Sequence, residues 1–119
     1  MKKTVVIGAS PNPERYSFKA VSLLKEKGFT VIPLGVKKGA VSGISILNDY
    51  PLIDEVHTIT LYIGLKHQFS LYNYILGLKP KRLIFNPGTE NLELFDLARD
   101  NGVEVINACT LVMLSVGNY

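Results

Sequence analysis

Five short apolar runs, separated by longer segments with helical periodicity, constrain the fold of this 119-residue chain more than any other feature. The runs are rich in β-branched and aromatic residues and lack a clean alternation of apolar and polar positions, which is typical of strands buried on both faces of a sheet. We expect strands at residues 4–7, 30–34, 56–61, 82–85 and 103–106. The sequence therefore predicts a five-stranded parallel sheet.

The segments between these runs carry apolar residues at helical spacing. Phe18, Val21 and Leu24 share one face of a helix predicted at 14–27, which ends before Gly28. Further helices are expected at 65–78, where a wide apolar arc predicts a second buried surface, and at 90–101; residues 105–119 predict the last strand and a buried or paired helix. The predicted fold class is α/β, a Rossmann-like doubly wound sheet with helices on both faces. No linker or repeat divides residues 1–119, so we expect one domain.

The loop after the first predicted strand has the composition of a phosphate-binding turn. Gly8 tolerates positive φ and carries no Cβ, Ala9 is small, Ser10 offers a hydroxyl, and the loop continues through Asn12 to the cationic Arg15. The helix that follows presents N–H groups and a partial positive charge at its N-terminus, which together stabilise an anion. Many α/β proteins turn on a glycine here with no ligand, so the pattern alone leaves a bound pyrophosphate and an empty turn open.

The residues after the second predicted strand favour one kind of nucleotide. A dinucleotide fold that prefers NAD normally has an Asp or Glu there to bind the ribose hydroxyls, whereas this chain has Val36, Lys37 and Lys38. Ammonium groups attract a phosphorylated ribose that a carboxylate would repel. The two lysines therefore favour coenzyme A or NADP, and the alternative is a solvated turn.

Four segments of the chain share a pattern with a known family. They are residues 6–15 (VIGASPNPER), 28–33 (GFTVIP), 86–90 (NPGTE) and the region around Cys109. Together they resemble the small stand-alone CoA-binding proteins, a group related to the CoA-binding domain of the succinyl-CoA synthetase α subunit. The chain departs from the family pattern at Tyr16 and Thr110, where that family commonly has proline, and at Gly35-Val36, where it commonly has Asn-Pro.

The resemblance implies a Rossmann-like domain that binds CoA or an acyl-CoA, with the pyrophosphate on the first loop and the start of the first helix. It also implies that Val36 lies against the adenine and Lys38 near the ribose phosphate, while later loops border the nucleotide or its pantetheine arm. The cofactor-binding residues predicted in this way are Gly8, Ala9, Ser10, Asn12, Arg15, Val36, Lys37, Lys38, Tyr62, Pro87 and Gly88.

The sequence predicts neither a catalytic constellation nor a metal site. His57 and His67 lie ten residues apart, without the spacing of metal ligands. Cys109 is interpreted as a buried small side chain rather than a reactive thiol, because no activating base lies near it in the sequence. Glu90 is more typical of a helix-dipole partner than of a general base. We therefore expect a non-catalytic binding or regulatory module.

Charge and cysteine content limit the expected partners and compartment. The net charge of +3 comes from scattered lysines and arginines rather than a basic stripe, so nucleic acid is not an expected partner. A single cysteine, no leader segment and no apolar run of membrane length favour a cytoplasmic protein without an internal disulfide or a membrane span. Two alternatives remain: an NADP-binding oxidoreductase or redox sensor, and a homodimeric interaction module that uses residues 65–78 or 111–116.

Overall fold

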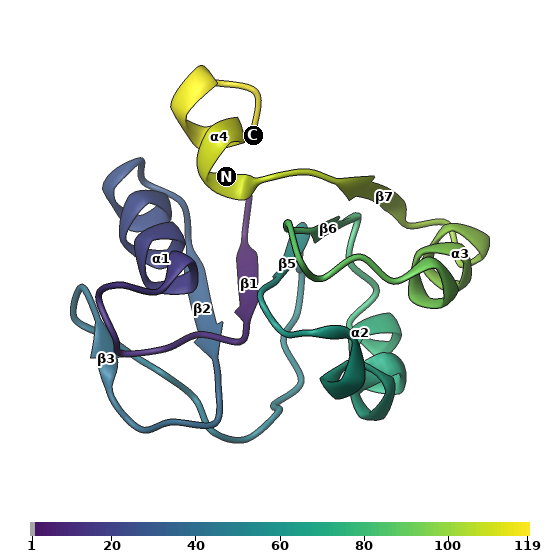
Figure 1. Cartoon of the computed structure of the whole chain (residues 1–119), viewed down its shortest axis with the longest axis horizontal. Coiled ribbons are helices and arrows are strands. Elements are labelled where there is room, and N and C mark those ends of the chain that lie inside the picture. The colour runs from purple at the N-terminus through teal and green to yellow at the C-terminus, as the bar shows by residue number, and fades with distance from the viewer. Residues whose placement is uncertain (1) are drawn as a thin grey trace.

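The central element of the fold is a five-stranded parallel sheet, which the computed structural model describes within residues 2–119. The strand order is β2-β1-β5-β6-β7 (Figure 1). This order confirms the predicted Rossmann-like α/β fold. The strands are β1 (Thr4–Ile7), β2 (Val31–Leu34), β5 (Thr58–Leu61), β6 (Arg82–Phe85) and β7 (Glu104–Asn107).

The register of the sheet brings the carboxyl ends of its strands into line. Ile7 of β1 lies beside Leu34 of β2 and Leu61 of β5, and Leu61 lies beside Phe85 of β6. The chain first adds β2 on one side of β1 and then crosses to β5 on the other side. The direction of winding therefore reverses between β1 and β5, which is where ligands bind in sheets of this kind.

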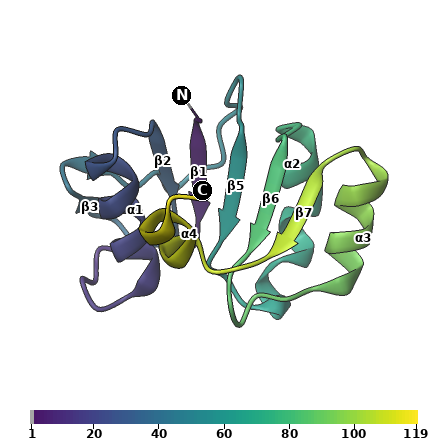
Figure 2. The ribbon, with the colours of Figure 1, turned by 90° about the horizontal axis from the view of Figure 1, so that it is seen from above.

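Helices cover both faces of the sheet, as predicted (Figure 2). On one face α1 (Tyr16–Glu26) and α4 (Thr110–Val116) pack over Val6 and Ile84. On the other, α2 (Tyr72–Gly77) and α3 (Leu92–Asp100) pack over Val5 and Leu83. Neighbouring residues of one strand point to opposite faces, so a fully buried run such as Val5-Val6 contributes to both cores.

The segment at 65–78 is not the single helix that its periodicity predicts. Two 3₁₀ turns, η1 (Leu65–His67) and η2 (Phe69–Leu71), precede the short α2. The polar Gln68 between them is fully buried, and its side chain bonds backbone carbonyls outside the segment. Leu65 and Phe69 are mostly exposed, so the broad apolar face predicted as buried lies partly at the surface of the single chain.

A hairpin of β3 (Ala40–Val41) and β4 (Ile44–Ser45), which sequence analysis missed, follows β2. Its turn places Ser42 and Gly43 at φ of 50° and 81°, and Val41 packs into the core beneath α1. Helix α1 also begins two residues later than expected. The reason is a local turn, in which the N–H of Glu14 donates to Oδ1 of Asn12 at 3.0 Å.

The last residues of the chain return to the amino end of the sheet. Helix α4 ends at Gly117, whose φ of 80° lets the chain reverse. The buried Tyr119 then forms a hydroxyl–hydroxyl hydrogen bond of 2.6 Å with Thr4, and its ring lies 4.4 Å from the Arg82 guanidinium. Val112 and Val116 stay exposed on α4. Within the described residues, no helix has the length and apolar character needed to cross a bilayer.

Candidate functional site

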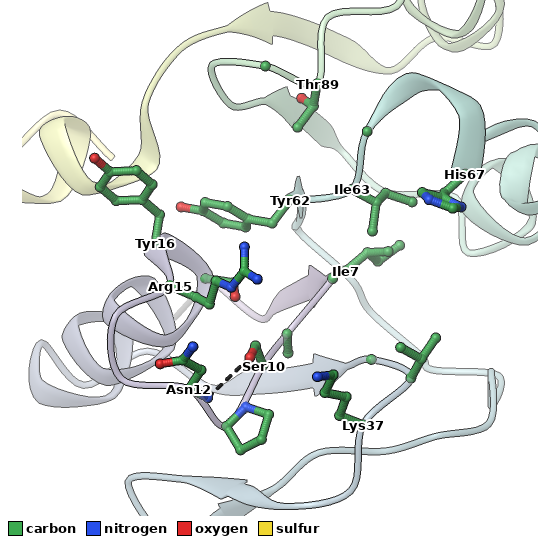
Figure 3. A pocket seen from close by; sticks show the side chains of 18 of the residues that line it. Ile7, Ser10, Asn12, Arg15, Tyr16, Lys37, Tyr62, Ile63, His67 and Thr89 are labelled. Carbon is green, nitrogen blue, oxygen red and sulfur yellow. Dashed lines mark hydrogen bonds between the residues drawn. The ribbon is translucent and has the colours of Figure 1, made fainter.

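A cavity of about 760 Å³ opens at the carboxyl end of the sheet, between the loops that follow β1, β2, β5 and β6 (Figure 3). Its volume lies within the range of roughly 300–1,000 Å³ common for small-molecule sites. Ten of the eleven predicted binding residues line it: Gly8, Ala9, Ser10, Asn12, Arg15, Val36, Lys37, Tyr62, Pro87 and Gly88. The eleventh, Lys38, is exposed and is not part of the lining.

Gly8 is required by the fold rather than by space for a ligand. It has a φ of 96°, and a Cβ there would lie 2.8 Å from the carbonyl carbon of Tyr62 and from Cγ2 of Ile63. The N–H groups of Gly8 and Ala9 both donate to the carbonyl of Leu34 at 2.9 Å, so they are not directed at a ligand. The groups that can meet an anion therefore lie further along, at the start of α1.

The N-terminus of α1 opens into the cavity without a side-chain cap. Arg15 is the N-cap residue in extended conformation, no side-chain hydrogen bond caps the helix, and its first turn holds no acidic residue. Tyr16 and Ser17 of the first turn line the cavity. The first N–H groups of a helix have no partner within it and carry its positive dipole end. Donors of this kind beside the Arg15 guanidinium have the chemistry that suits an anion.

The loop after β2 lies directly against the loop after β1. A Cβ on Gly35 would lie 2.2 Å from the carbonyl oxygen of Ala9, so only glycine permits this approach. The Nδ2 of Asn48 donates to the carbonyls of Gly35 and Lys37 at 2.8 and 3.0 Å, which fixes the loop beside the cavity. The cavity wall therefore holds Arg15 and Lys37 and no acidic side chain.

The ring of Tyr62 forms part of the wall, close to Arg15 and Tyr16 (Figure 3). Its hydroxyl is buried and has no hydrogen-bond partner within the described residues. Burial raises the pKa of this hydroxyl well above its usual range, and the nearby Cys109 thiol raises it further. Tyr62 therefore stays neutral at physiological pH and presents a ring face rather than a charge.

The sequence profile of a family described as "CoA binding domain" matches residues 2–115. The chain belongs to this family. A solved structure described only as an uncharacterized protein is 54% identical, with a TM-score of 0.98 over 100% of this chain and 98% of that one. A hypothetical protein from Pyrococcus horikoshii OT3 is 25% identical, with a TM-score of 0.87 over 97% of this chain and 82% of that one. A conserved hypothetical protein from Pyrococcus furiosus is 26% identical, with a TM-score of 0.80 over 94% of this chain and 98% of that one.

The cavity has lining residues that sequence analysis missed. Tyr16 and Ser17 line the cavity because α1 starts at Tyr16. Tyr50 lines it because the unpredicted hairpin carries the chain back to the cavity. The Tyr50 ring lies edge-on to Tyr74 at 5.2 Å, which holds it in place. The other missed lining residues are Ile7, Pro11, Gly35, Ile63, Gly64, His67 and Thr89.

Several polar residues considered for chemistry lie away from the cavity or are used by the domain itself. His57 and Cys109 are not part of the lining. Glu90 accepts a hydrogen bond of 2.9 Å from the N–H of Gly88, so this carboxylate stabilises its own loop. Among residues 2–119, no group of three or more His, Cys, Asp or Glu side chains is placed to hold a metal ion.

Proposed function

We propose that this protein binds CoA or an acyl-CoA as a non-catalytic binding or regulatory module, with the pyrophosphate at the start of α1. One observation carries the proposal: the uncapped N-terminus of an 11-residue helix opens on a cavity whose wall includes Arg15 and Lys37 but no acidic side chain. Helix N–H groups, the helix dipole and two cations favour the same kind of ligand, a polyphosphate. Membership of the CoA-binding domain family supports CoA as that ligand.

Lys37 is the proposed contact for the ribose phosphate of the cofactor. It lines the cavity on the side of β2, whereas the neighbouring Lys38 does not. The resemblance implies Lys38 for this contact, and the sequence alone does not distinguish between the two adjacent lysines. Val36 is 86% exposed and Tyr50 is 43% exposed, so both offer apolar surface against which an adenine can lie.

Calorimetric titration of the purified protein with CoA, NADP and NAD tests the proposal. We expect CoA to bind best and the Arg15→Gln variant to lose about tenfold or more in affinity. Arg99→Gln is the matched control, because Arg99 is an exposed arginine on α3 that pairs with Asp96 at 3.1 Å and lies outside the cavity lining. Gly8→Val is unsuitable as a test, since its side chain would collide with Tyr62 and Ile63 just after β5.

The three ligands also separate the proposal from its rivals. NADP bound more tightly than CoA would favour the oxidoreductase or redox sensor, since NADP carries a ribose phosphate too. No binding of any of the three would overturn the proposed function and leave the interaction module as the better account.

A further inference from the structure

A single buried side chain joins two of the four loops that enclose the cavity. Gln68 is 0% exposed, and its Nε2 donates to the carbonyl of Ile63 at 3.0 Å and to the carbonyl of Thr89 at 2.8 Å. Ile63 belongs to the loop after β5 and Thr89 to the loop after β6, and both line the cavity. Both amide protons of Gln68 are thus used to hold these two parts of the wall at a fixed separation.

The other end of this amide is anchored as well. Oε1 of Gln68 accepts a hydrogen bond of 2.9 Å from Nδ2 of Asn91, the N-cap residue of α3, and the same Nδ2 donates to the Tyr72 hydroxyl at 2.9 Å. Thr89 is held independently, since its N–H and its hydroxyl both donate to the carbonyl of Asn86, at 2.9 and 2.8 Å. A fully satisfied buried network of this kind fixes geometry, because any displacement leaves a polar group unpaired.

The position of this network within the cavity indicates which part of a ligand it affects. The start of α1 follows β1 and Lys37 follows β2, whereas Ile63 and Thr89 follow β5 and β6, which lie on the other side of β1 from β2. With the nucleotide of CoA at the start of α1 and Lys37, the pantetheine arm extends toward the opposite side, between the loops after β5 and β6. That is the side which Gln68 holds together.

We propose that Gln68 is a positioning residue that sets the width of the passage between the loops after β5 and β6, and thereby the fit of the pantetheine arm and its thiol or acyl end. The inference rests on the proposed function, because it needs the nucleotide half of CoA at the start of α1. Gln68 acts through the carbonyls of Ile63 and Thr89 rather than by touching the ligand, since its own side chain is fully buried and outside the lining.

Two substitutions and two ligands test this role. Gln68→Glu places a carboxylate against two carbonyl oxygens to which it cannot donate, and Gln68→Met keeps the length of the side chain but removes both bonds. The ligands are CoA and 3′-phospho-ADP, the half of CoA that lacks pantetheine. Asn73→Asp is the control for charge, because Asn73 is exposed on α2 and outside the cavity lining.

We expect Gln68→Glu to weaken CoA binding about tenfold while 3′-phospho-ADP binding stays within about twofold of the wild type. Gln68→Met should likewise weaken CoA binding more than 3′-phospho-ADP binding, and Asn73→Asp should change neither affinity. Equal losses for both ligands would show a merely structural role and overturn the inference, as would unchanged CoA binding. If wild-type protein binds neither ligand, the proposed function itself fails, which is a distinguishable result.

A measurement on the unmodified protein keeps the inference testable if both variants fold poorly. Gln68 is the one glutamine in the sequence, so selective labelling with ¹⁵N-glutamine gives a single pair of side-chain amide signals. We expect CoA to shift these signals and 3′-phospho-ADP to leave them in place, because only the pantetheine arm reaches the two loops. Signals that respond alike to both ligands would contradict the proposed role.

Discussion

Helices α1 and α3 both begin at the carboxyl edge of the sheet, yet only the N-terminus of α3 has a side-chain cap. The N-cap residue of α3, Asn91, accepts a hydrogen bond of 3.2 Å from the N–H of Leu94, and Glu93 adds a negative charge in the first turn. The N-cap residue of α1 is Arg15, which caps nothing and adds a positive charge. The chain therefore satisfies the N-terminus of α3 internally and leaves that of α1 without a side-chain cap.

The two helix ends differ in which backbone donors the fold leaves unsatisfied. Both helices follow parallel strands, and both carry the same dipole. Only α1 leaves its first N–H groups without a cap on the wall of a cavity lined by cations, so only α1 is equipped to hold a phosphate.

The largest effect is expected when α1 is given an acidic N-cap, so that its N-terminus resembles that of α3. Arg15→Asp supplies a cap and a negative charge at once, so we expect CoA affinity to fall about a hundredfold while the ligand-free protein gains about 1 kcal/mol in free energy of unfolding. Calorimetry and chemical unfolding measure the two quantities. Arg15→Asn, which supplies the cap without the charge, should lie between the two proteins in affinity. CoA affinity that is retained in Arg15→Asp would remove α1 from the site.

The reverse change removes the cap of α3. Asn91→Ala should lower the free energy of unfolding by about 1–2 kcal/mol, because it deletes the cap and leaves the buried Oε1 of Gln68 without its donor. Since the proposed phosphate site lies at the start of α1 and not at α3, 3′-phospho-ADP should bind the variant as it binds the wild type. Thermal unfolding and calorimetry check the two halves of this prediction. A loss of 3′-phospho-ADP binding without unfolding would mean that both helix ends serve the ligand.

A smaller effect is expected from Lys37, the proposed contact of the ribose phosphate. Lys37→Gln should weaken CoA about fivefold and leave dephospho-CoA unchanged, because only CoA carries the ribose phosphate. Lys38→Gln is the matched control one residue away, exposed and outside the cavity lining. The loss should shrink as salt is raised, since the interaction is exposed to solvent. If Lys38→Gln weakens CoA more than Lys37→Gln does, the assignment of the two lysines is reversed.

The smallest effect concerns the amino end of the sheet, away from the cavity. Burial, followed by the charges of Arg82, Lys2 and Lys81, lowers the pKa of His57 below its ordinary value of 6.5. The folded chain therefore binds fewer protons than the unfolded chain, so the free energy of unfolding rises with pH through the window below about 6.5 and falls on acidification. His57→Gln should flatten this slope in unfolding measured between about pH 5 and 7.5. CoA affinity at a given pH should not change, and a change would link the two ends of the sheet.

Sequence patterns predicted the sheet well, because buried parallel strands are continuous apolar runs that few other structures produce. The strands at 4–7 and 82–85 have the predicted bounds, and the loop with Arg15 lies at the cavity. The hairpin at 40–45 was not predicted, because strands of two residues are too short to show a hydrophobic period. The interruption of the helix at Gln68 was not predicted, because the apolar spacing in 65–78 does not show that this side chain donates to the carbonyls of Ile63 and Thr89, outside the segment.

The predicted site residues that line the cavity belong to the loops after the strands, as Gly8, Arg15 and Pro87 do. Tyr50 was missed because it reaches the cavity by way of the hairpin, and Thr89 because its place is fixed by contacts with Asn86. The positive φ expected at Gly8 is confirmed at 96°. The missing Cβ, however, makes room for Tyr62 and Ile63 of the loop after β5 rather than for a ligand, and a sequence alone contains no record of that neighbour.

The most direct test of the account is to follow the backbone amide signals of the ¹⁵N-labelled protein as CoA is added. We expect the N–H signals of Ser10, Tyr16 and Ser17 to move most strongly, while those of Glu93 and Leu94 at the start of α3 stay in place. Signals that shift at the start of α3 and remain still at the start of α1 would contradict the central claim that the uncapped end of α1 holds the cofactor's phosphates.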